Sequence, residues 1–228
     1  MNRIDYFPVL SSLVAGELAW LRKCSSLDAE LNTLSPSTEI GSGDLYTDSL
    51  ELLQLASAVD QMFHLHETGV EEYLLRYRKL SDWAEIVSTS LQKKAERLTF
   101  RTSGSTGKPK SCEHRIADLE QEVEVHAALF PDCGRILTLV PLHHIYGFIW
   151  TVMLPQQLGV EILDVRRWSP SKLFNQLRSG DLLIGTPTVW QNISDSVGSF
   201  LVYPGSNIWR TLSCISVPGA PRASTGAD

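Results

Sequence analysis

The sequence predicts an α/β protein: a mostly parallel sheet with flanking helices, preceded by a helical region. Three observations predict this class. Beyond residue 96, strand-like apolar segments alternate with helix-like segments, which is typical of a parallel sheet with helical crossovers. Residues 1–96 contain helix-like segments only, apart from a Ser/Thr/Gly/Pro-rich stretch at 34–44. The chain of 228 residues is 43% hydrophobic and 20% charged, which allows a substantial core.

The helical region, 1–96, is expected to hold four helices. Their apolar spacing places them at 9–23, 49–64, 70–77 and 81–94. The second helix opens on Asp48-Ser49-Leu50. Asp48 is suited to cap it, and Glu51, three residues later, completes the pattern of a capping box.

The second part, 97–228, is expected to be a partial α/β domain. Helical spacing and boundary residues, such as Ser169 and Pro170 at one start, predict helices at 116–130, 148–158, 169–178 and from 187. Strands are expected at 97–101, 135–140, 160–165, 181–185 and 211–217. Ligands bind beyond the carboxyl ends of parallel strands. We therefore expect the segments after residues 101 and 140 to lie at one edge of the sheet.

The segment 99–110, Thr-Phe-Arg-Thr-Ser-Gly-Ser-Thr-Gly-Lys-Pro-Lys, brings hydroxyls, glycines and lysines onto one loop. Such a loop suits a polyphosphate, because N–H and hydroxyl groups bond the oxygens while lysine balances the charge. The P-loop of NTPases is excluded by the spacing. That pattern requires glycine where Thr102 stands, and Ser or Thr where Pro109 follows Lys108. A polar surface turn is the structural alternative.

A second segment, 141–148, reads Pro-Leu-His-His-Ile-Tyr-Gly-Phe and follows a predicted strand. Two adjacent histidines after a strand are often only turn or cap residues. Their distance from the first loop, about one βα unit, favours a functional role for this segment.

Together these motifs resemble the adenylate-forming (AMP-binding) superfamily, in its N-terminal portion. Residues 102–110 match its T-S-G-[ST]-T-G-x-P-K pattern at every position, and 141–147 match P-[LM]-x-H-x-x-[GA]. The helical front half and the His-Ile-Tyr-Gly motif most resemble 4-coumarate–CoA ligase-like proteins linked to photoactive yellow protein. His143 stands where the family usually has an aromatic residue.

The resemblance implies the site residues. Binding of the nucleotide is carried over to Thr102, Ser103, Gly104, Ser105, Thr106, Gly107, Lys108 and Lys110. Catalytic roles are carried over to His144 and Lys110. Substrate contacts are carried over to His144, Tyr146, Gly147, Gly219 and Ala220.

The activity implied is ATP-dependent conversion of a carboxylic acid, aryl or hydroxycinnamic, to acyl-AMP. A thioester with CoA or a carrier thiol would follow, with Mg²⁺ as the metal cofactor. The family's Tyr-Gly-x-Thr-Glu segment and lysine-bearing C-terminal domain are not found after residue 221. We therefore expect an incomplete form, truncated before the lid, with little turnover on its own.

Two alternatives remain open. The first is a carrier-like or interaction module, in which Ser49 would carry a phosphopantetheine arm and the α/β part would be inactive. A carrier usually has glycine shortly before Asp-Ser-Leu, whereas this chain has Leu45-Tyr46-Thr47. The second is a truncated product without function.

Other classes are disfavoured by composition. A net charge of −6 without a basic aromatic patch argues against nucleic acid. The apolar runs are too short for a bilayer, and no secretory signal is evident. Scattered cysteines fit a reducing cytoplasm. No metal site is expected, because His64 and His66 do not share a helix face.

Overall fold

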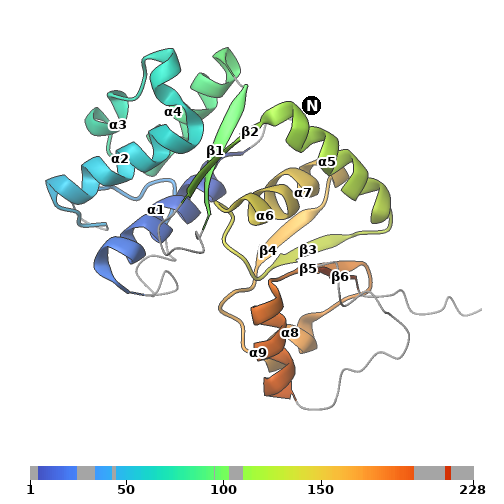
Figure 1. Ribbon diagram of the computed structural model, residues 1–228. Helices are drawn as coiled ribbons and strands as arrows, with labels where there is room; N and C mark the ends of the chain where they lie inside the picture. The colour runs from blue at the N-terminus through green and yellow to red at the C-terminus, as the bar shows by residue number, and fades with distance from the viewer. Residues whose placement is uncertain are drawn as a thin grey trace, which may run out of the picture.

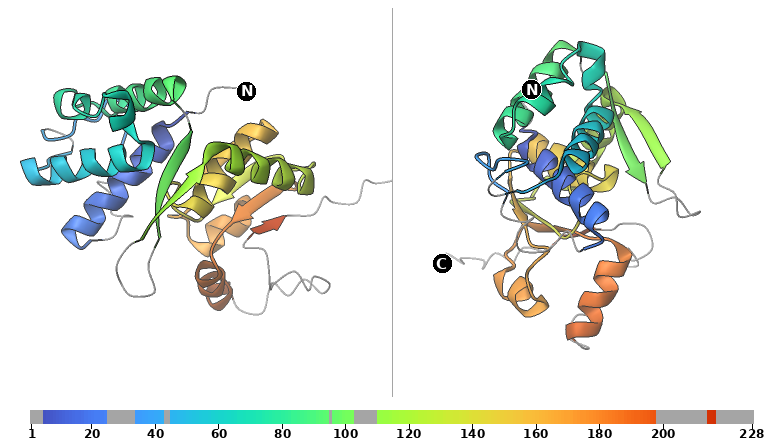
Figure 2. Two further views of the ribbon diagram at one scale, coloured as in Figure 1. Left: turned by 45° about the horizontal axis from the view of Figure 1, so that its top comes forward. Right: turned by 90° about the vertical axis from the view of Figure 1, so that its left-hand side faces the viewer.

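The structure is a computed structural model that describes residues 5–24, 34–42, 45–94, 96–102, 110–197 and 214–216. Its described part has the predicted class: helices gathered at the N-terminal end and a mostly parallel sheet flanked by helices (Figure 1). A two-stranded ribbon lies between these parts, as Figure 2 shows.

The N-terminal helices are close to the predicted ones. They are α1 (Phe7–Arg22), α2 (Ser49–Phe63), the short 3-10 helix η1 (Leu65–Thr68), α3 (Tyr73–Arg76) and α4 (Leu80–Lys93). The predicted capping box at α2 is confirmed. The Asp48 carboxylate accepts hydrogen bonds from the backbone N–H groups of Leu50 and Glu51, and the Glu51 side chain accepts one from the Asp48 N–H. His64 then ends α2 in the left-handed conformation.

Strands β1 (Arg97–Thr102) and β2 (Lys110–Arg115) form an antiparallel ribbon of their own. The expectation that the strand at 97–101 belongs to the parallel sheet, with its loop at that sheet's edge, is therefore wrong. The physical reason is that its partner is the next strand, β2, which alternates between exposed and half-buried residues. One face of the ribbon packs on the core through Leu98 and Phe100, both buried.

The four-stranded sheet has the order β4–β3–β5–β6. Its strands are β3 (Arg135–Thr138), β4 (Glu161–Asp164), β5 (Asp181–Ile184) and β6 (Cys214–Ser216). Both β4 and β5 pair with β3 in parallel, whereas β6 pairs with β5 antiparallel. Arg135, Leu137 and Thr138 are buried in the central strand β3, as its apolar run predicts.

Helices cover both faces of this sheet. One face carries α5 (Ile116–Leu129) and a continuous helical run made of α6 (Ile145–Phe148), the π-helical segment η2 (Ile149–Met153) and α7 (Leu154–Leu158). The other carries α8 (Pro170–Gln176) and α9 (Pro187–Val197). Successive residues of a strand face opposite ways. Accordingly, Ile136 joins the main core while Leu137 packs with Leu173 of α8.

The main hydrophobic core spans the two sequence regions. It contains Leu10 and Val14 of α1, Trp83 of α4, Phe100 of β1 and Phe148 of α6. The rings of Phe100 and Phe148 have centroids 5.3 Å apart. The ribbon is therefore held between the N-terminal helices and the helices on the sheet, so the two predicted regions share one core.

Candidate functional site

Two sequence motifs that lie about 40 residues apart meet where β1 ends. The imidazole of His144, in the loop after β3, hydrogen-bonds to the backbone of Arg101. Arg101 immediately precedes Thr102, the first residue of the predicted phosphate loop. At the same end of the ribbon, the Thr102 hydroxyl donates to the Lys110 carbonyl oxygen at 3.3 Å. The base of the phosphate loop and the histidine motif thus form one candidate site.

The predicted nucleotide-binding residues are only partly placed. Thr102 is half-buried and Lys110 is exposed. Within the described part of the chain, no acidic side chain forms an ion pair with Lys110. Its ammonium is therefore available to an anion. The remaining predicted residues lie outside the described residues: Ser103, Gly104, Ser105, Thr106, Gly107, Lys108, Gly219 and Ala220.

His144 is exposed and stands just before α6, as its N-cap residue. Neighbouring residues partly remove water from its ring, which lowers the pKa of His144 below the usual histidine value. The hydrogen bond to the Arg101 backbone opposes this shift. The ring is therefore biased toward its neutral form, in which one nitrogen donates a hydrogen bond and the other accepts one.

Gly147, predicted to contact substrate, is packed against the chain itself. A Cβ at this position would lie 1.9 Å from the Pro141 carbonyl oxygen. Only glycine permits so close an approach. Tyr146, half-buried on the same helix, has its ring centroid 6.2 Å from that of Trp150.

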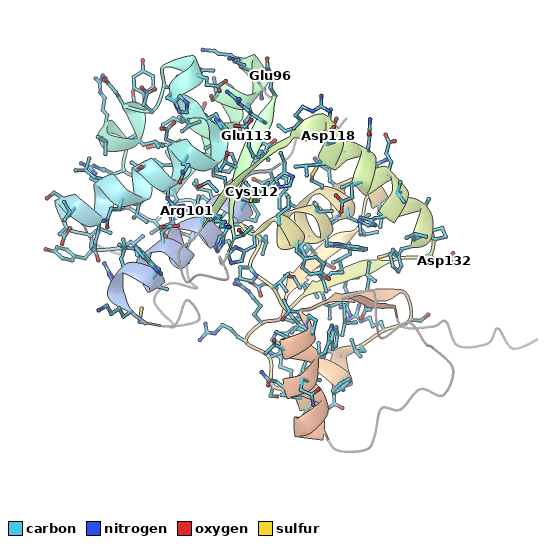
Figure 3. The ribbon with its side chains drawn as sticks, viewed as in Figure 1. Glu96, Arg101, Cys112, Glu113, Asp118 and Asp132 are labelled. Atoms are coloured by element: carbon cyan, nitrogen blue, oxygen red, sulfur yellow. The ribbon has the colours of Figure 1, made fainter. Side chains whose placement is uncertain are left out.

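Arg101 is anchored by two helices, which the sequence alone did not indicate. One guanidinium nitrogen lies 2.7 Å from a Glu17 carboxylate oxygen of α1, and two donate to the Gln61 amide oxygen of α2 at 2.8 and 3.0 Å. Figure 3 shows Arg101 where the ribbon meets these helices. The residue preceding the phosphate loop is therefore fixed from both sides.

A small cavity of about 60 Å³ lies between these groups, and His143, His144, Arg101, Glu17 and Thr99 help to line it. Pockets for drug-sized ligands measure roughly 300–1,000 Å³. This cavity is therefore large enough for a water molecule or a carboxylate group but not for a whole aromatic acid.

A larger open cavity of about 420 Å³ lies beside it, bounded in part by Gln61, His66, Arg97, Thr99 and Glu113. Glu113 is exposed on strand β2, and Figure 3 labels it beside the ribbon. All the residues that line it are polar or charged, so it suits a solvated ligand better than an apolar one.

A group of three possible metal ligands adjoins this cavity. The turn after α2 brings ligand atoms of His64, His66 and Glu67 within 4.8 Å of one another, a proximity that helix-face reasoning missed. Each group is already engaged. Glu67 is bound by Arg97 and Lys94, His64 Nε2 by the Thr99 hydroxyl at 2.9 Å, and His66 Nδ1 by Asp60 at 2.9 Å. Arg97 and Lys94 already place two positive charges beside the Glu67 carboxylate, and these would repel a metal cation. The absence of a metal site stays a prediction.

Ser49, the candidate attachment residue, is exposed at the first position of α2. Its neighbours Asp48 and Glu51 are occupied in the capping box.

No helix in the described part of the chain has the length and apolar character needed to cross a membrane.

Comparison with known proteins defines the class. A profile of the AMP-binding enzyme family matches residues 44–221, which are most of the chain. The chain therefore belongs to the AMP-binding enzyme family.

Two of the curated relatives that the chain matches are 4-coumarate–CoA ligases. A 4-coumarate–CoA ligase of Halorhodospira halophila is 37% identical over 196 residues, which are 86% of this chain and 50% of that protein. A 4-coumarate–CoA ligase of Cereibacter sphaeroides is 39% identical over 155 residues, covering 65% and 38%. The chain thus spans about half the length of the curated relatives it matches. A solved structure, ATP-bound MatB from Rhodopseudomonas palustris, aligns with a TM-score of 0.43 at 11% identity, covering 82% of this chain and 44% of that one.

Proposed function

We propose that this chain forms part of an ATP-dependent acid–thiol ligase that activates an aryl or hydroxycinnamic acid. A carboxylate oxygen attacks the α-phosphorus of ATP, the bond to pyrophosphate breaks, and acyl-AMP forms. A thiol sulfur of CoA or of a carrier then attacks the acyl carbon, and AMP leaves. The barrier comes mostly from crowded negative charge, so catalysis consists of positioning and of neutralisation by fixed cations.

The observation that carries this proposal is the contact between His144 and Arg101. It brings the acid-side motif to the base of the phosphate loop, where the reacting carboxylate and phosphate must meet. The similarity to 4-coumarate–CoA ligases over most of this chain supports the same reading.

Each described residue has a proposed role. Lys110, whose ammonium is exposed and unpaired within the described residues, would hold phosphate oxygens, and Thr102 would join it when its hydroxyl turns from the Lys110 carbonyl oxygen to the nucleotide. His144 would contact the carboxylate as the neutral imidazole. Mg²⁺ would neutralise the polyphosphate, but the described acidic groups near the site offer it no ready ligand, since Glu17 is paired with Arg101. The thiols of Cys112 and Cys133 form no disulfide within the described residues, which supports a cytoplasmic location.

Nucleotide binding tests the proposal. Lys110→Ala should weaken ATP binding at least about tenfold, since a charge-assisted bond contributes ~1.5–3 kcal/mol. Lys93→Ala is the matched control, because Lys93 is an exposed lysine in the last turn of α4, away from this site. Isothermal titration calorimetry with ATP and Mg²⁺ measures both variants. Equal affinity in the two variants would refute the role of Lys110, and no ATP binding by the unchanged chain would refute the proposal.

A second candidate, a carrier-like module, is favoured by one observation: Ser49 is exposed at the start of α2, directly after Asp48. Incubation with a phosphopantetheinyl transferase and CoA should then add one phosphopantetheine to the chain, and Ser49→Ala should prevent it. Mass spectrometry that finds the chain unchanged would exclude this candidate.

A further inference from the structure

His143 replaces the aromatic residue usual at its position, and the structure shows what it does there. The ring is partly buried and its Nδ1 lies 2.8 Å from the Ser12 hydroxyl of helix α1. Ser12 is itself buried. A polar ring removed from water needs such a partner, because a ring nitrogen without a hydrogen bond in the protein would lose the one it made to water and destabilise the fold.

The same hydroxyl also binds the backbone of this loop. The Leu142 N–H donates to Ser12 Oγ at 3.1 Å. With one lone pair of Oγ occupied by the Leu142 N–H, the hydroxyl proton can donate to His143 Nδ1, an arrangement that places the ring hydrogen on Nε2. Burial, with His144 and Arg166 as the nearby groups that also disfavour a positive charge, lowers the pKa of His143 to about 3. The ring therefore stays neutral and can accept this proton.

Helix α1 also makes room for the ring. A Cβ on Gly16, one turn after Ser12, would lie 2.7 Å from His143 Cε1 and 2.9 Å from Nε2. Real Cβ atoms do not approach so closely, so a side chain here would displace the imidazole. The next residue, Glu17, holds Arg101 at 2.7 Å. One face of α1 thus contacts both the histidine loop and the base of the phosphate loop.

We propose that helix α1, which precedes the family-matched residues 44–221, positions the site: Ser12 fixes His143 as the Nε2–H tautomer, Gly16 leaves room for its ring, and the placed ring orients His144. The rings of His143 and His144 have centroids 4.3 Å apart, so a displaced His143 moves its neighbour. His143 and Ser12 are positioning residues and need not touch substrate. The part that concerns His144 in acid binding rests on the proposed function, whereas the tautomer and its cause do not.

Nitrogen-15 NMR of the full chain tests the inference directly. Long-range ¹H–¹⁵N spectra should show His143 as the neutral Nε2–H tautomer near neutral pH. Ser12→Ala should yield a mixture of tautomers and shift the ring signals of His144. Gly16→Ala, which keeps the hydroxyl but displaces the ring, should shift the same signals. An Nδ1–H tautomer in the unchanged chain, or unaltered His143 and His144 signals in Ser12→Ala, would overturn the proposal.

Ser11→Ala is the matched control. It removes a hydroxyl from the adjacent position of α1, and Ser11 Oγ is buried without a hydrogen-bond partner in the described part of the chain. Its spectra should match those of the unchanged chain.

A binding measurement separates this inference from the proposed function. With ATP present and 4-coumarate as the probe, Ser12→Ala should raise the Kd of the acid about tenfold, while Ser11→Ala should not. If the unchanged chain binds no 4-coumarate while the NMR result holds, the proposed function fails and the positioning of the histidine loop stands. If 4-coumarate binds equally to Ser12→Ala, the link from His143 to the acid is refuted.

Discussion

Arg135 and Asp181 form a buried ion pair between the two central strands of the sheet. They are register partners on β3 and β5, with Arg135 Nε 2.8 Å from one Asp181 carboxylate oxygen and another guanidinium nitrogen 2.5 Å from the second. Asp181 is 2% exposed, and its carboxylate also accepts the Arg178 N–H at 2.8 Å. The pair fixes the strand ends opposite to those that lead into the histidine motif.

Breaking this pair should destabilise the protein strongly. Asp181→Asn leaves the buried guanidinium without its counter-charge and should reduce the free energy of unfolding by about 3 kcal/mol. Urea denaturation followed by circular dichroism measures it. The double variant Arg135→Met/Asp181→Leu should recover much of the loss, because two apolar side chains leave no charge unpaired. A single variant as stable as the unchanged chain would contradict this account.

Acid should weaken the ion pairs that Glu67 of η1 forms with Lys94, at the end of α4, and with Arg97 of strand β1. Hydrogen bonds from Arg97 and Lys94 lower the pKa of Glu67 from 4.5 to about 2. Since the folded-state pKa lies below the unfolded one, the stability from Glu67 is present above pH 4.5 and is lost as the pH falls toward 2. Glu67→Gln should therefore flatten the pH dependence of unfolding in that window. Glu124→Gln, on the exposed side of α5, should keep the original slope.

The contact of Gly147 with Pro141 should make position 147 intolerant of a side chain. Gly147→Ala places a methyl group against the Pro141 carbonyl oxygen and should lower the free energy of unfolding by about 3 kcal/mol. Gly134→Ala is the control, since the nearest atom to its Cβ would be 4.0 Å away. Thermal unfolding compares them. Equal melting temperatures would show that the turn between Pro141 and Gly147 rearranges freely.

The cap of α2 should contribute modestly to the free energy of unfolding, and this contribution can be measured separately from that of Ser49. Asp48→Ala removes the acceptor for two backbone N–H groups and should cost about 1 kcal/mol. Ser49→Ala, at the exposed next position, should change stability by less than about 0.5 kcal/mol. Chemical denaturation of both variants checks this. A large loss in Ser49→Ala would mean that the serine has a structural role instead of the one considered for attachment.

Most regular elements could be predicted because their signals are local. The apolar spacing of Leu119 and Val123 marked α5, and the continuous apolar run of β3 marked a strand covered on both faces. Asp48 and Glu51 predicted the first residue of α2 correctly. In the candidate site, Thr102, Lys110 and His144 were found by matching a motif. Their family is confirmed, and their roles stay predictions.

The rest depended on contacts that no local pattern encodes. Strand β2 was missed because Lys110–Arg115 carries mostly polar residues, with half-buried positions only at Cys112 and His114. The bond from Ser12 to His143 joins residues 131 positions apart. The gathering of His64 with His66 and Glu67 accompanies the left-handed turn at His64, a conformation that histidine adopts only occasionally.

The place of α1 has a practical consequence for anyone who expresses this domain. A fragment that begins at residue 44, where the family profile starts, would lack helix α1, which packs against α2 and α4. The apolar side chains of the core that pack with Val9, Leu10, Val14 and Leu18 would then be exposed to solvent. Bare apolar surface of that extent promotes aggregation. Such a fragment would precipitate before its chemistry could be measured, so the N-terminal helix belongs in every recombinant version of the protein.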